Sequence, residues 1–272
     1  MQRRRKIFLL SLMSVMAAVT VITTLYGQSQ NSPTPVRQEK TSRQHIPVDD
    51  YPIADPTAPE PSDPQQRDRR RAKNSRYNLP DKTLRGLKNF VLDEDSVLIG
   101  ITQRPDHASP EPAIPASQSD AIVIGEVTDA KAYLSEDRSS VYSEFAVLLT
   151  EVLKDSSVLQ LTPNVSIITE RSGGRVRLSS GKILLRGFSH KGMPRIGRRY
   201  VLFLKLNAEE QDFSIITGYE LRAGRVFPLD GVPEDDYKLP QFAAYEGADE
   251  TKFLNDLRTA IAQAASEKGA KQ

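Results

Sequence analysis

The stretch Ser140 to Lys154 reads SVYSEFAVLLTEVLK and alternates between two kinds of side chain. Val141, Phe145 and Val147 occupy every second position, whereas Glu144 lies on the opposite parity. Successive side chains of a strand point to opposite faces of the sheet. The stretch therefore predicts a strand with one buried apolar face and one polar face.

Similar short runs surround this stretch. AIVIGEVTDAKAYL (121–134) precedes it, and the turn-like SEDRSS (135–140) between the two predicts a long hairpin. Six further runs are expected to be strands: NVSIITE, GRVRL, KILLRG, RYVLFLKL, FSIITGYEL and GRVFPLD. Many short strands with regular turns and no intervening helices are typical of a closed barrel or a small sandwich. The predicted fold class is mainly β, with a small closed antiparallel barrel over residues 119–232, whose OB-like type is implied by a resemblance given below.

Three arginines crowd the entrance of GMPRIGRRYVLFLKL (192–206): Arg195, Arg198 and Arg199. Either this is a phosphate-binding loop or it is a turn that enters a strand. Gly197 and the proline before it favour a turn, and no glycine-rich cradle leads into a helix start. We therefore expect a turn followed by a strand that is buried on both faces.

The C-terminal tail, 233–272, ends in a helical pattern. Apolar side chains recur at helical spacing over 249–267, and Asp249 is a plausible N-cap. We expect this helix either to pack on the barrel or to cover its open end.

The N-terminus predicts export. Four basic residues, 3–6, precede twenty uncharged residues, Ile7 to Tyr26, which match the span of a bilayer. A small-x-small site at 27–29 leaves cleavage open, so residues 1–29 are either a signal anchor or a signal peptide. The protein is expected in a bacterial cell envelope, membrane-anchored with an extracytoplasmic C-terminal domain, or secreted if the segment is cleaved.

Residues 30–80 are rich in proline and predict a disordered linker. Its basic cluster RDRRRAK (67–73) is interpreted as a solvated charge run. Residues 81–118 form an extension whose structure the pattern leaves open. The net charge is +4 over residues 1–30, +2 over 31–80 and −4 over 81–272, so the basic pI comes from the N-terminal segments and does not indicate nucleic-acid binding.

Several runs together resemble a known group: SDAIVIGEVTDAKAYLSEDRSSVYSEF, the following EVLK, SGGRVR, GRRYVLFL and ITGYELRAGRVFPLD. They are similar to uncharacterised bacterial envelope proteins whose domain resembles the OB-like barrel of netrin-type and metalloprotease-inhibitor modules. The resemblance covers about Ser119 to Asp230 and implies the fold but no activity. The inhibitor modules act through an N-terminal cysteine, which this chain lacks.

The sequence offers little catalytic chemistry. With no cysteine, thiolate nucleophiles, disulfides and Cys-ligated metals are excluded. The three histidines, His45, His107 and His190, show no metal-ligand spacing, and Ser189 beside His190 lacks the context of a catalytic triad. We expect no enzymatic activity, no cofactor and no metal.

One charge pattern suggests a surface. Residues 171–208 hold ten basic and no acidic side chains, whereas 119–170 hold nine acidic and three basic ones. The two blocks either pair across strands, around Glu144 and Glu151, or form separate faces. If a basic face exists, the candidate binding residues are Arg175, Arg177, Arg186, Arg195, Arg198 and Arg199, and an anionic glycan or an envelope protein is the expected partner.

These observations predict a non-enzymatic exported envelope protein, monomeric, that displays a β-barrel binding or interaction module. The alternatives are a structural or assembly component of an envelope complex and, third, a hydrolase whose site the sequence does not reveal.

Overall fold

A computed structural model describes residues 51–78, 98–102, 112–178, 180–188, 191–231 and 240–269. The chain divides into two compact units, 1–44 and 45–272, and every described residue belongs to the second. The predicted N-terminal segment Ile7–Tyr26 and the histidines His45, His107 and His190 lie outside the described residues. Among the helices that are described, none has both the length and the apolar character needed to cross a bilayer.

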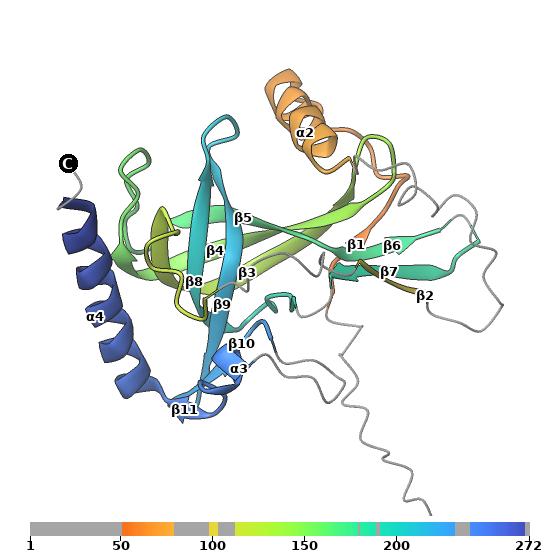
Figure 1. Cartoon of the computed structure of the whole chain (residues 1–272). Coiled ribbons are helices and arrows are strands. Elements are labelled where there is room, and N and C mark those ends of the chain that lie inside the picture. Colours follow the sequence, from red (N-terminus) through yellow and green to blue (C-terminus); the bar gives the residue numbers. More distant parts are fainter. Residues whose placement is uncertain are drawn as a thin grey trace, which may run out of the picture. The chain divides into compact units, whose positions relative to one another are not determined.

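The described unit is mainly β, as predicted, and most of its strands form one seven-stranded sheet (Figure 1). Its strands are β3 (Ala121–Leu134), β4 (Val141–Lys154), β5 (Ser166–Ser172), β8 (Arg199–Asn207), β9 (Asp212–Arg222), β10 (Arg225–Pro228) and β11 (Ala248–Asp249).

Five of these strands close a ring of hydrogen bonds in the order β3, β4, β5, β9 and β8, since β8 pairs with both β9 and β3. All the pairs are antiparallel except β5 with β9, where Thr169 lies opposite Phe213 in a parallel arrangement. The purely antiparallel pairing that the sequence predicted is therefore wrong at this one junction.

Strand β8 is buried on both faces, as the sequence predicted. Leu202 and Leu204 pack with Phe145 in one cluster, whereas Val201 and Phe203 pack in a second cluster with the C-terminal helix. Burying apolar area on both faces contributes about 25 cal/mol for each Å² removed from water. Strand β8 therefore contributes to both the apolar cluster inside the ring and the cluster between the ring and helix α4.

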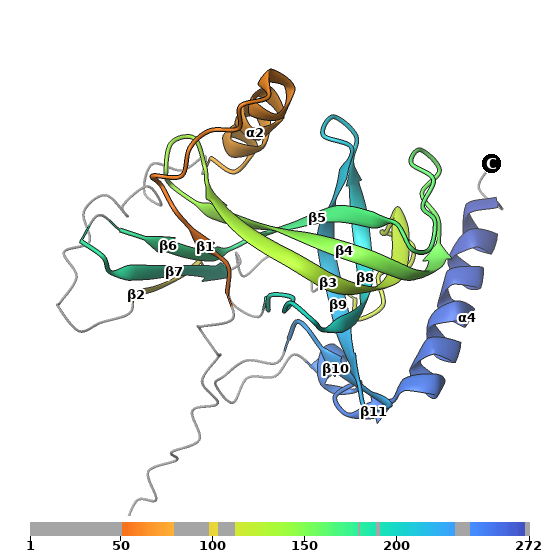
Figure 2. The same cartoon turned by 180° about the vertical axis from the view of Figure 1, so that it is seen from behind.

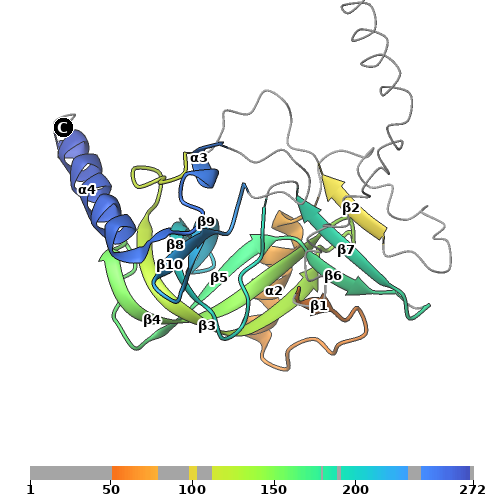
Figure 3. The same cartoon turned by 90° about the horizontal axis from the view of Figure 1, so that it is seen from below.

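A second, four-stranded sheet departs from the prediction of a single barrel domain. It contains β1 (Ile53–Ala54), β6 (Gly174–Arg177), β7 (Ile183–Phe188) and β2 (Leu98–Thr102). Figure 2 shows the chain passing from β5 into β6, and Figure 3 shows β2 beside β7. Gly174 marks this corner with a positive φ of 144°, and a Cβ there would lie 2.8 Å from the Ser143 hydroxyl, so a side chain is excluded.

The C-terminal helix agrees with the sequence prediction. Helix α4 spans Glu250–Gly269, and the Asp249 carboxylate accepts a hydrogen bond from the Lys252 amide, which caps its first turn. Phe253 and Leu257 pack against the outer face of the ring, together with residues of the short helix α3 (Pro240–Ala243).

The predicted disordered linker is wrong for residues 51–78. Helix α2 spans Pro64–Arg76 and contains the basic cluster 67–73, which was expected to be a solvated charge run. Asp63 caps its N-terminus by accepting from the Gln65 amide, and Pro64 occupies the first turn, where a missing N–H costs nothing. Proline here starts a helix instead of preventing one.

Candidate functional site

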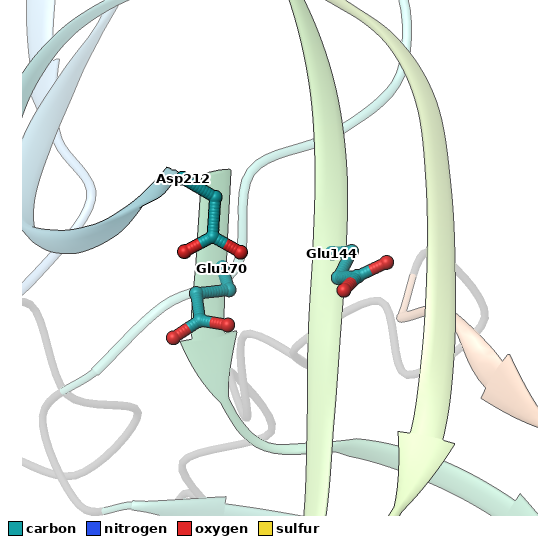
Figure 4. Close-up of side chains that lie close together, drawn as sticks. All are labelled: Glu144, Glu170 and Asp212. Carbon is teal, nitrogen blue, oxygen red and sulfur yellow. The ribbon is translucent and has the colours of Figure 1, made fainter. Parts of the chain in front are cut away.

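Four carboxylates converge on the polar face of the ring at one end. Glu144 on β4 and Glu170 on β5 lie opposite each other in register, Asp212 begins β9, and Glu210 lies in the loop before it. We call these four residues the acidic recess. Oxygen atoms of Glu144, Glu170 and Asp212 all lie within 4.8 Å of one another, and Figure 4 shows the side chains of Glu170 and Asp212 side by side next to β4.

Burial makes this cluster unusual. Glu170 is 0% exposed and Asp212 is 4% exposed. Carboxylates are rarely buried unless they are paired, because transferring an isolated charge out of water is costly. The recess therefore requires cations.

Helix α2 supplies these cations. Its basic residues lie between 71 (Lys73 to Glu144) and 139 (Lys73 to Asp212) positions before the carboxylates in the sequence. The Arg70 guanidinium donates two hydrogen bonds to the Glu144 carboxylate, at 2.9 and 3.0 Å. Lys73 Nζ donates to Glu144 at 2.6 Å and also contacts Asp212. Each cation is thus held by charge-assisted hydrogen bonds, which are stronger than neutral ones.

Arg76 completes the row of cations. It pairs with Glu170 and, at 2.9 Å, with Glu210. Glu170 also accepts hydrogen bonds from the Tyr77 hydroxyl at 2.9 Å, the Asn207 amide at 3.0 Å and the Ser214 hydroxyl at 3.1 Å. Residues from β5, β8, β9 and α2 therefore meet at one carboxylate.

Aromatic rings contact Arg70 itself and Tyr77, the residue that follows α2. The Tyr77 ring stacks on Tyr142 with centroids 4.3 Å apart and an interplanar angle of 6°. The Arg70 guanidinium lies 3.4 Å from the centroid of the Tyr133 ring, in a cation–π arrangement. The cation–π contact with Tyr133 helps to orient Arg70 toward Glu144.

The turn between β3 and β4 touches the end of α2. The Glu136 amide donates to the Asn74 carbonyl at 3.1 Å, and the Ser75 hydroxyl contacts the Glu136 carboxylate. The helix thus bridges this turn and the β8–β9 loop.

Within the recess, the pKa values of Glu144 and Glu170 shift in opposite directions. Burial alone would raise the pKa of Glu144, but the hydrogen bonds and charges of Arg70 and Lys73 lower it below its ordinary value. Burial and the neighbouring charge of Asp212 raise the pKa of Glu170, despite Arg76 and Lys73. The pKa of Lys73 is raised, because attraction by Glu144 and Asp212 outweighs the effect of its burial.

Two kinds of chemistry fit such a cluster in principle. Three carboxylates offer oxygen ligands to a divalent cation, and two carboxyls with opposed pKa shifts are a pattern of acid–base pairs. The Lys73 ammonium lies among the three carboxylates, however, and α2 covers them. In this arrangement the recess binds cationic side chains.

The six arginines of the predicted basic face differ in their exposure. Arg175 and Arg186 are buried, at 8% and 6% exposure, so they do not belong to an exposed face. Arg175 donates to the Tyr51 carbonyl at 2.7 Å. Burial lowers the pKa of Arg186.

The other four candidates are at least partly exposed. Arg177 ends β6, whereas Arg195, Arg198 and Arg199 lie at the entrance of β8. Arg198 lies 3.8 Å from Glu220, and Arg199 pairs with Glu250 at the start of α4. Binding by these four residues stays a prediction.

The predicted pairing between the acidic and basic blocks holds for Lys205 and Asp120, which lie 3.0 Å apart, but it is wrong at the two glutamates named for it. Glu144 pairs with Arg70 and Lys73 of α2, and Glu151 pairs with Arg258 of α4 at 3.0 Å. The partners of these two glutamates thus come from two helices outside the predicted blocks.

Sequence reasoning missed the acidic recess and its cations. Two signals were present. Asp63-Pro64 is a helix start, and Arg70, Lys73 and Arg76 then follow at intervals of three, which places them on one side of a helix.

No protein-family model, curated protein or solved structure matches the chain.

Proposed function

We propose that this protein is a non-enzymatic, exported envelope protein whose β ring is an interaction module, and that its binding face is the acidic recess. The observation that carries the proposal is the set of buried carboxylates, satisfied by cations of one distant helix. The ligand class that such a face selects is a basic protein segment.

The ring supports an OB-like barrel as the finer description of the fold. Counted along the chain, its strands are β3, β4, β5, β8 and β9, which is the strand number of that fold. OB-like barrels bind ligands on the face of their second and third strands and through the loops between strands one and two and between strands four and five. The corresponding parts here are β4 and β5, the turn at 135–140 and the loop at 208–211, and α2 contacts all of them.

A basic ligand is favoured over an anionic one by charge. A glycan or nucleic acid with negative groups would meet Glu144, Glu170, Glu210 and Asp212 on this face. The arginines of the expected basic face do not replace it, because two are buried and Arg198 and Arg199 lie beside carboxylates. We therefore propose an envelope protein as the partner, which also fits a role in assembly.

The absence of a recognisable nucleophile in the sequence and the coverage of Glu170 by α2 support a binding role over hydrolysis. Export and anchoring rest on the basic N-terminus and the apolar run Ile7–Tyr26.

Binding of a labelled peptide with the sequence of residues 61–79 tests the proposal in a full chain whose own α2 is weakened by Arg70→Gln and Arg76→Gln, so that the helix does not cover the face. We expect saturable binding that weakens at least tenfold when Glu144→Gln is added, while adding the change of Arg195, Arg198 and Arg199 to Gln leaves it unaltered. Equal binding with and without Glu144→Gln would contradict the proposed face. Binding of heparin that depends on the three arginines would favour the anionic partner instead.

A further inference from the structure

Helix α2 occupies the proposed binding face, and its composition is that of a ligand rather than of a core element. Apart from Pro64 at its start, its sequence, PQQRDRRRAKNSR, contains one alanine and no larger apolar side chain. An isolated 13-residue helix is marginal in water, and a helix that is polar all round lacks an apolar face to bury. Its attachment therefore depends on the charged and aromatic contacts with the ring.

The contacts define a pattern that the recess selects. Arg70, Lys73 and Arg76 are spaced at i, i+3 and i+6, so they follow one side of the helix. Arg70 reaches Glu144, Lys73 reaches Glu144 and Asp212, and Arg76 reaches Glu170 and Glu210. Three cations at this spacing satisfy four carboxylates on different elements.

The ion pairs between α2 and the recess can be replaced by those of another basic helix, because their net free energy is small. Removing charges from water is costly, and the attraction between buried partners roughly offsets this cost. Side chains of Arg70 and Arg76 also stay 23% and 33% exposed, so salt and water weaken their pairs. The net free energy that holds α2 is therefore small compared with the number of its contacts.

The same face continues beyond α2 as an apolar surface. Ala146 and Leu148 follow Glu144 on the same side of β4, and Ile168 precedes Glu170 on β5, with Ala146 opposite Ile168 in register. Leu148 is 36% exposed and Ile168 is 43% exposed. These aliphatic side chains lie beside the charged recess and are not buried by α2. They therefore offer apolar area to another partner.

We propose that α2 is an intramolecular competitor for its own binding face. The external partner is a segment of another envelope protein that forms a basic helix, carries cations at the spacing of Arg70, Lys73 and Arg76, and covers Leu148 and Ile168 with apolar side chains. Binding of that partner displaces α2. This inference rests on the proposed function, because it specifies the ligand and the regulation of the acidic recess.

Competition makes a quantitative prediction. When the chain's own helix fills the face, the apparent affinity for an external ligand falls in proportion to the fraction of molecules with an open face. Weakening α2 without changing the recess should therefore raise the affinity for a peptide added in solution.

The test uses the full chain and a fluorescent peptide with the sequence of residues 61–79. Two variants of α2 carry the same charge change: Arg70→Gln with Arg76→Gln, which faces the recess, and Arg69→Gln with Arg71→Gln, which faces solvent. We expect the first variant to bind the peptide at least tenfold more tightly than wild type and the second to bind like wild type. Adding Glu144→Gln to the first variant should abolish the gain.

The failures are distinguishable. If the first variant is folded and does not bind the peptide, the recess is not a binding face and the proposed function fails. If wild type and both variants bind equally through Glu144, the face exists but α2 does not compete, and only the present inference fails.

A second measurement serves if the first variant does not fold. Hydrogen exchange of the wild-type chain with saturating peptide should show faster exchange of the α2 amides, whereas β4 and β5 stay protected. Unchanged α2 protection while the peptide is bound would overturn the competition. The apolar contact is tested by a series of peptides in which one exposed position of residues 61–79 at a time is replaced by Leu. Tighter binding by at least one of them that is lost in Leu148→Ser or Ile168→Ser supports the apolar contact, and a series in which no peptide binds more tightly contradicts it.

Discussion

Glu144 and Glu170 are neighbours across β4 and β5, yet their pKa values shift in opposite directions. A lowered folded-state pKa, as in Glu144, contributes stability above the unfolded-state value near 4.5 that is lost as the pH falls through the folded value. A raised pKa, as in Glu170, has the opposite sign, so stability rises as the pH falls from the raised value toward 4.5.

This difference predicts distinct effects of two isosteric substitutions. Glu144→Gln should lower the free energy of unfolding at pH 7 by about 1 to 3 kcal/mol, because it removes charge-assisted bonds to Arg70 and Lys73. Glu170→Gln should cost less at pH 7, and its deficit relative to wild type should grow as the pH is lowered toward 5. Urea denaturation from pH 4 to 8 measures both. Identical pH profiles for wild type and Glu170→Gln would contradict the raised pKa.

A second buried ion pair joins Arg171 of β5 to Asp230, which follows β10. Arg171 donates to Asp230 at 2.5 Å and to the Gly192 carbonyl at 2.9 Å, and both charged side chains are almost fully buried. Removing one partner of such a pair leaves an uncompensated charge and costs about 3 to 5 kcal/mol.

Asp230→Asn should therefore destabilise the chain by about this amount. The matched control is Glu220→Gln. Its partners Arg198 and Arg222 lie 3.8 and 3.9 Å away and are 45% and 50% exposed, so the substitution should cost at most about 1 kcal/mol. Thermal melts of the two variants compare them directly, and equal shifts in Tm would show that burial of the Arg171 pair is not decisive.

Strand β8 is the element on which both apolar clusters depend. Leu204 is fully buried, whereas Ile196, in the turn before the strand, is 58% exposed. Leu204→Asp should unfold the chain, since it places an unpaired charge in the core, and Ile196→Asp should change stability by about 0.5 kcal/mol or less. Far-UV circular dichroism during heating distinguishes the two, and a normal melt for Leu204→Asp would contradict the described packing of β8.

The strands of the ring could be predicted because each carries its own signal. Val141, Phe145 and Val147 alternate with polar residues, and Leu202 lies in a run that is apolar at every position, as expected for a strand covered on both sides. Helix α4 was predictable from the spacing of Phe253 and Leu257 and from the Asp249 cap.

The second sheet and the docking of α2 could not be predicted in the same way. Strands β1 and β2 pair in parallel with β6 and β7, across more than 80 residues, and local periodicity carries no information about such partners. Helix α2 has no apolar period at all. Its position depends on Glu144, Glu170 and Asp212, which come together only when three strands of the ring are assembled.

At the scale of the whole molecule, the basic N-terminus predicts a topology in which residues 3–6 stay in the cytoplasm and the β ring is exported. A reporter that is active only after export, fused to Gln272, should be active, and a cytoplasmic reporter at the same site should be inactive. The reverse pattern would contradict the proposed localisation.

The cations of α2 fill the acidic recess of the ring, and a double-mutant cycle between Arg70→Gln and Glu144→Gln can measure this contact. The measured quantity is the free energy of unfolding of the full chain. The control cycle joins Arg71 and Glu60, which lie 3.7 Å apart and are both about two-thirds exposed. The structure predicts a coupling of about 1 kcal/mol or more for the first pair, and none beyond about 0.5 kcal/mol for the second. Additive effects of Arg70→Gln and Glu144→Gln, within about 0.5 kcal/mol, would show that α2 does not lie in the recess.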